Sequence, residues 1–168
     1  MRSALVSLAL CLVVAGLAAS VAGAKLSPAE NTWAKSMIGT YNVMSKELDI
    51  VISEEEANNA LIARTPANAT LTKTLEAFAL CGTAVKKAGP APSTRLNPFL
   101  TSMNAACLHL GIGANWVAKA IGAIGKGNGT LGKTDLGKSV TEFKTGSNDL
   151  AVAAKKLLAI GGKAIFTA

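Results

Sequence analysis

A run of apolar residues between positions 100 and 124 limits what this chain can fold into. The run consists of Leu100, Met103, Cys107, Leu110, Ala114, Val117, Ile121 and Ile124. Steps that alternate between three and four residues put every side chain on one side of an α-helix, whereas a β-strand needs a period of two. The alternation is also a heptad seam, which is typical of helices packed lengthwise in a bundle. We therefore expect a packed helix here, beginning at Asn97-Pro98 with the asparagine as its cap.

A second helical segment begins at residues 27–30, where the sequence Ser-Pro-Ala-Glu has the form of a capping box. Its apolar stripe is Trp33, Met37, Tyr41, Met44, Leu48 and Val51. The segment ends before Pro66, because a residue that precedes proline is pushed out of helical geometry. A further capping sequence, Ser53-Glu54-Glu55-Glu56, predicts a new helix start near Ser53. The bundle therefore has four helices, or five if the helix that begins at residues 27–30 breaks near Ser53.

Two more helices complete the expected bundle. One starts at Asn68 or Thr70 and stops at Gly89, and its apolar face is Leu71, Leu75, Phe78, Gly82 and Val85. The last is capped by Thr134 or Asp135, and its seam is Leu136, Val140, Phe143, Ser147, Leu150, Ala154 and Leu157. The glycine-rich residues 125–129 are interpreted as a flexible connection before it. No stretch of the sequence has a sustained period of two, so the predicted fold is an all-α antiparallel bundle.

The first 24 residues have the order of a secretory signal peptide. Arg2 precedes an apolar run over residues 4–19, and residues 22–24 (Ala-Gly-Ala) place small side chains at a signal peptidase site. A membrane anchor needs about 20 apolar residues, so we expect cleavage near Ala24 rather than the alternative, an uncleaved anchor. Residues 25–168 then form a single helical-bundle domain of an exported protein, secreted or otherwise extracytoplasmic.

Two cysteines remain after that cleavage, Cys81 and Cys107. In an exported chain an even number of cysteines is most simply paired. Cys107 lies on its helical seam, and Cys81 falls at the margin of the apolar face of the preceding helix, where a neighbouring helix is within reach. We expect one inter-helix disulfide between them; the alternative is two buried free thiols.

The chain contains no motif that specifies a catalytic, cofactor or metal site, so we expect a non-enzymatic protein. His109 is the only histidine, and two residues away from Cys107 on a helix it points about 200° from that cysteine. Residues 54–56, three consecutive glutamates, also point in three different directions. Residues 125–130 lack the full spacing of a phosphate-binding loop. Because aromatic residues are scarce, nucleic acid is not expected as a partner.

Two short sequences are acceptor sites for N-glycosylation. They are Asn68-Ala69-Thr70 and Asn128-Gly129-Thr130, and both fall in predicted loops.

The formal net charge is +7, and the excess of lysine is concentrated in the last third of the chain. These lysines are interpreted first as charge that keeps the bundle soluble. The alternative is an anionic-surface contact through Lys119, Lys126, Lys133, Lys155, Lys156 and Lys163. Our leading hypothesis is a secreted or cell-surface bundle that binds a protein partner or an apolar ligand. A ligand would occupy an interior left under-filled by the small seam residues Ala114, Ser147 and Ala154. The alternative is a cationic membrane-active protein, antimicrobial or toxin-like, that acts through residues 105–168.

The expected plan is similar to that of secreted four-helix inhibitor domains of the plant invertase and pectin-methylesterase type, which also join helices by a disulfide. The N-terminal disulfide hairpin of that family is absent from this sequence. The resemblance is therefore one of architecture, and it implies no functional residue here.

Overall fold

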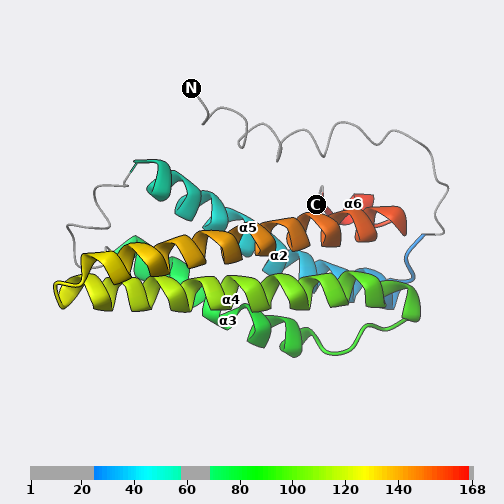
Figure 1. Ribbon diagram of the computed structural model, residues 1–168. Helices are drawn as coiled ribbons and strands as arrows, with labels where there is room; N and C mark the ends of the chain where they lie inside the picture. The colour runs from blue at the N-terminus through cyan, green and yellow to red at the C-terminus, as the bar shows by residue number, and fades with distance from the viewer. Residues whose placement is uncertain (1–24, 58–68, 167–168) are drawn as a thin grey trace, which may run out of the picture.

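The structure is a computed structural model that describes the backbone of residues 25–57 and 69–166, with side chains for all of these except 52–57, 69, 70, 163 and 164. Its elements are α2 (Pro28–Ala57), α3 (Ala69–Ala88), the 3-10 turn η2 (Thr94–Leu96), α4 (Asn97–Gly125), α5 (Gly129–Ala159) and the short α6 (Lys163–Phe166). The four long helices form an antiparallel all-α bundle, as predicted (Figure 1). Helix α4 packs against both α3 and α5, and α2 packs against α3.

The capping box predicted at the start of α2 is present. The Ser27 backbone N–H donates to Glu30 Oε2 at 2.7 Å, and the Glu30 backbone N–H donates to Ser27 Oγ at 3.3 Å. The predicted apolar stripe is buried except for Tyr41, which is half-buried.

The helix start predicted at Ser53 is wrong, because α2 continues through Ser53 to Ala57. A cap stabilises amide groups that have no carbonyl acceptor one turn earlier. Inside α2 the preceding turns already supply those carbonyls. Residues 54–56 therefore lie in the last turns of α2 and not at the start of a new helix.

The disulfide between Cys81 and Cys107 joins α3 to α4, with the two Cα atoms 5.2 Å apart. The prediction that Cys81 lies at the margin of its helix is wrong, since its side chain is only 1% exposed. The buried residues of α3 are Thr74, Phe78, Cys81 and Val85, spaced four, three and four apart. The buried face is therefore rotated from the predicted one, whose Leu71, Leu75 and Gly82 are only half-buried.

The start of α4 differs in one respect from the expectation. Pro98 lies in the first turn as predicted, but Asn97 is already helical and the cap position is Leu96, which makes no side-chain cap. The 3-10 turn η2 runs directly into the helix, so its carbonyls take the place of a capping side chain.

The connection between α4 and α5 was expected to be flexible, but it is a tight turn with defined hydrogen bonds. Gly127 adopts a positive φ of 80°, which favours glycine, and its N–H donates to the Ile124 carbonyl at 2.9 Å. Asn128 follows as the cap of α5, and its Oδ1 accepts from the Leu131 N–H at 3.1 Å. The caps predicted at Thr134 and Asp135 are therefore wrong, because Asn128 already starts the helix before them.

The interface between α4 and α5 consists largely of small residues spaced seven apart. On α5 these are Gly132, Ser139, Gly146 and Ala153, and on α4 they are Ala106, Gly113 and Ala120, all buried. A Cβ atom placed on Gly146 would lie 2.9 Å from Leu110 Cγ, so the two backbones approach more closely than larger side chains would permit.

This close approach changes which face of α5 is buried. Phe143, Leu150 and Leu157 are buried as predicted. The other predicted seam residues, Leu136, Val140, Ser147 and Ala154, are only half-buried. The buried face is therefore rotated from the predicted seam toward the small residues.

Candidate functional site

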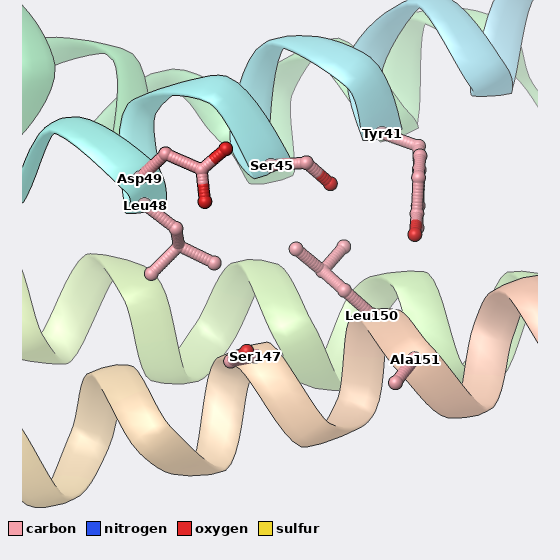
Figure 2. Close-up of a pocket in the computed structure, with 7 residues that line it drawn as sticks. All are labelled: Tyr41, Ser45, Leu48, Asp49, Ser147, Leu150 and Ala151. Carbon is pink, nitrogen blue, oxygen red and sulfur yellow. The ribbon is translucent and has the colours of Figure 1, made fainter. Parts of the chain in front are cut away.

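The hollow between α2 and α5 is small. It has a volume of about 40 Å³ and is lined by Tyr41, Ser45, Leu48, Asp49, Ser147, Leu150 and Ala151. Figure 2 shows the residues from α2 facing those from α5 across it. Sites for small molecules usually enclose about 300 Å³ or more, so this space does not fit an apolar ligand.

The seam positions expected to leave the interior under-filled do not create a larger space there. Ser147 lines the small hollow. Ala114 is buried in the core, where it is 5% exposed, and Ala154 is half-buried on α5. The helices pack closely together at these small side chains, so no larger cavity remains between them.

A larger, open hollow of about 580 Å³ lies at the α4–α5 turn, and we call it the basic hollow. It is lined by Lys119, Gly122, Ala123, Lys126, Asn128, Leu131 and Asp135. Lys119 and Lys126, the latter of which caps α4, each lie three or four residues from both Gly122 and Ala123, so the four residues share one side of the helix end. Leu131 and Asp135 are four apart on α5 and complete the opposite wall.

Two lysines are held against one indole ring beside this hollow. The Nζ atoms of Lys119 and Lys138 lie 4.3 Å and 4.1 Å from the centre of the Trp116 ring. Such cation–π contacts position an ammonium group while leaving it charged. Lys119 comes from α4 and Lys138 from α5, so Trp116 links the two walls.

The one carboxylate in the basic hollow is already neutralised. Asp135 Oδ1 is 2.9 Å from Lys138 Nζ, and the Asp135 side chain is only 7% exposed. Lys119 and Lys126 are exposed, and so is Leu131, at 47%. The exposed charged side chains of the lining are therefore both lysines, and Leu131 and Asn128 are exposed beside them.

The six lysines expected to form one anionic-surface contact are placed in two groups. Lys119, Lys126 and Lys133 are exposed near the α4–α5 turn, whereas Lys155 and Lys156 lie near the other end of α5. The 22 residues from Lys133 to Lys155 correspond to about 33 Å of helix. The side chain of Lys163 lies outside the described residues.

Lys156 is engaged within the protein. Its Nζ donates to Ser102 Oγ at 2.9 Å, across the α4–α5 interface. A serine beside a lysine can act as a nucleophile and base only where substrate reaches the hydroxyl. Ser102 is 5% exposed, so the pair links two helices and offers a substrate little access.

His109 has a partner that the sequence did not indicate. Its Nδ1 lies 2.7 Å from Glu142 Oε2 on α5, and both side chains are partly exposed. Among the residues whose side chains are described, there is no group of three histidine, cysteine, aspartate or glutamate residues that could hold a metal ion.

An ion pair between Arg95 and the buried Glu30, at the start of α2, was also missed by the sequence analysis. Glu30 is 5% exposed and accepts from Arg95 Nε at 2.7 Å, from Arg95 Nη2 at 2.5 Å and from Ser93 Oγ at 2.5 Å. Hydrogen bonds from Arg95, then Ser93 and Ser27, hold the pKa of Glu30 well below its usual range. The pair joins the start of α2 to the α3–α4 connection, so its role is structural.

Of the two glycosylation sequences, one can be placed. Asn128, Gly129 and Thr130 are all exposed, and Asn128 lies at the rim of the basic hollow. Asn68 lies outside the described residues.

Comparisons of this chain with protein-family models, with curated proteins and with solved structures found no match.

Proposed function

We propose that this chain is an exported, non-enzymatic binding protein whose basic hollow holds an acidic segment of a partner protein. One observation carries the proposal. The hollow of about 580 Å³ presents Lys119 and Lys126 without a competing exposed carboxylate, because Asp135 is paired with Lys138. An acidic peptide matches both its charge and its concave shape.

Preorganisation supports the same proposal. Lys119 and Lys138 are positioned by the Trp116 ring, and the turn is fixed by Gly127 and the Asn128 cap. A surface whose charged groups are already held in place loses less side-chain freedom on binding. The exposed Leu131 adds an apolar contact of the kind found inside protein interfaces.

An anionic membrane is the alternative occupant. The span Thr94–Gly125 is long and apolar enough to cross a bilayer by length and composition. Phe99, Met103, Leu110 and Val117 of this span, however, are buried in the core of the bundle, whereas Leu108 is 60% exposed. Of the six lysines expected at an anionic surface, Lys119, Lys126 and Lys133 also lie near the α4–α5 turn, whereas Lys155 and Lys156 lie near the other end of α5.

The test is binding of a fluorescent acidic peptide, rich in glutamate, to the mature oxidised protein. The variant Lys119→Glu/Lys126→Glu reverses the charge of the hollow. The control Lys35→Glu/Lys46→Glu changes the net charge equally at exposed positions of α2. We expect salt-sensitive binding that the hollow variant loses and the control keeps.

Equal loss in both variants would mean that only overall charge matters, and the proposal would be rejected. Vesicles of neutral and of anionic lipid are measured in parallel at low and high salt. Binding to anionic vesicles without binding to the peptide would replace the proposal with the membrane alternative.

A further inference from the structure

We infer that Asn128 is an N-glycan acceptor and that the glycan attached there covers the basic hollow. The inference rests on the proposed export of the chain, and its consequence concerns the surface proposed above for binding. It starts from the Asn128-Gly129-Thr130 sequence, which has the acceptor spacing and no proline at its middle position.

The geometry of the α4–α5 turn leaves the reacting atom accessible. Asn128 is exposed, and so are Gly129 and Thr130 on the first turn of α5. The side-chain hydrogen bond of Asn128 uses Oδ1, which accepts from the Leu131 N–H at 3.1 Å. A glycan is joined through Nδ2, so attachment and the helix cap use different atoms of the same amide.

The backbone of the turn does not depend on an unmodified side chain. The Asn128 N–H donates to the Ala123 carbonyl at 2.9 Å, and the Asn128 carbonyl accepts from the Gly132 N–H at 3.1 Å. These bonds fix the turn on both sides of Asn128. The folded bundle therefore accommodates a modified Asn128 without losing the start of α5.

The modification is a group transfer from a lipid pyrophosphate-linked oligosaccharide. A bond forms between Asn128 Nδ2 and the anomeric carbon of the first sugar, while the bond from that carbon to the pyrophosphate oxygen breaks. The lipid pyrophosphate is the leaving group, and the amide nitrogen gives up one proton. The acceptor residue keeps its remaining N–H and its Oδ1.

The position of Asn128 decides what the glycan would cover. Asn128 is one of the residues that line the basic hollow, together with Lys119, Lys126 and Leu131. A bulky, hydrophilic chain rooted at the rim would stand between these side chains and any partner. The fraction of molecules with a glycan on Asn128 would thus determine the fraction in which the basic hollow is uncovered.

The experiment expresses the full chain, with its own first 24 residues, in a eukaryotic secretory host. Thr70→Ala removes the other acceptor sequence, so that sugar on the secreted protein reports on Asn128. We expect a glycan mass on the peptide that contains Asn128. The double variant Thr70→Ala/Thr130→Ala should lose this mass, because alanine removes the acceptor sequence but keeps the Asn128 cap.

A second variant guards against loss of folding. Asn128→Asp keeps an oxygen that can cap α5 but has no Nδ2, so it should also be secreted without the glycan mass. A Thr70→Ala protein secreted without sugar on Asn128 would overturn the inference.

Coverage is read from the labelling of lysines by a bulky amine-reactive reagent. Lys119 and Lys126 should label several-fold more slowly in the glycosylated protein than in the Thr70→Ala/Thr130→Ala protein, whereas Lys35 and Lys46 should not change. If Lys119 and Lys126 were labelled at the same rate in the glycosylated protein as in the Thr70→Ala/Thr130→Ala protein, the glycan would not cover the hollow. Neither readout involves the acidic peptide, so failure of peptide binding would reject the proposed function and leave this inference standing.

Discussion

The two outer long helices, α2 and α5, pack against their neighbours through side chains of different size. Helix α2 contributes large side chains such as Trp33, Met37 and Met44, which are 8%, 0% and 3% exposed. Helix α5 contributes Gly132, Ser139, Gly146 and Ala153 at its closest approach to α4. Large side chains fill the space between separated backbones, whereas small ones remove that space. Helix α2 should therefore be sensitive to the removal of atoms, and α5 to their addition.

The largest expected effect is the truncation of a large α2 side chain. Met37→Ala should lower the free energy of unfolding by about 3 kcal/mol, because it leaves a cavity at a fully buried position. The measurement is urea denaturation followed by circular dichroism. Val43→Ala, at a position that is 47% exposed on the same helix, is the control. Equal losses from the two variants would contradict the assignment of the α2 core face.

The disulfide is expected to contribute nearly as much between α3 and α4. Replacing Cys81 and Cys107 by alanine should lower the free energy of unfolding by about 3 kcal/mol, mainly because the unfolded chain gains freedom. The same denaturation series measures it. If reduction of the unaltered protein left its urea midpoint unchanged, the disulfide would have no part in stability.

Addition of atoms to α5 tests the other half of the comparison. Gly146→Val should destabilise the protein by about 2 kcal/mol through overpacking. Its Cβ would meet Leu110 Cγ at 2.9 Å and the Ala106 carbonyl oxygen at 3.4 Å, and Leu110 is fully buried with no room to move aside.

Gly137→Ala is the matched control on the same helix. A Cβ at Gly137 has no neighbour within 4 Å, so this substitution should stabilise the helix by about 0.5 to 1 kcal/mol. Stabilisation by both substitutions would mean that α4 and α5 do not approach closely at Gly146.

The last comparison concerns pH and the ion pair between Glu30 and Arg95, which joins the start of α2 to the α3–α4 connection. The pKa of Glu30 is lowered by folding, so the unfolded chain binds the proton more readily than the folded protein does. The free energy of unfolding therefore decreases as the pH is lowered. The loss should begin near the ordinary value of 4.5 and continue below it. In Glu30→Gln the melting temperature should fall less steeply between neutral and acid pH. Parallel curves for the two proteins would assign the acid sensitivity to other carboxylates.

The sequence alone determined the helical class, the start of α2, the end of α3 and the disulfide partners. Each of these depends on neighbouring residues or on a simple count. The Ser27–Glu30 box is local, Gly89 adopts the positive φ that ends a helix, and the two cysteines outside the first 24 residues have one possible pairing with each other. The apolar stripe of α2 was also readable, because that helix is buried through large side chains.

The tertiary structure decided the features that depend on how closely two helices approach. A seam predicted from the spacing of apolar residues depends mainly on the large ones. The prediction therefore placed the α5 seam on Leu136 and Val140 rather than on Gly132 and Ser139. The seven-residue spacing of small residues on α4 and α5 was present in the sequence as a signal for the correct face. The basic hollow had no such signal, because its walls come from both sides of a turn whose geometry is set by Gly127 and Asn128. The bond between Glu30 and Arg95, 65 residues apart, likewise exists only because folding brings the start of α2 and the α3–α4 connection into contact.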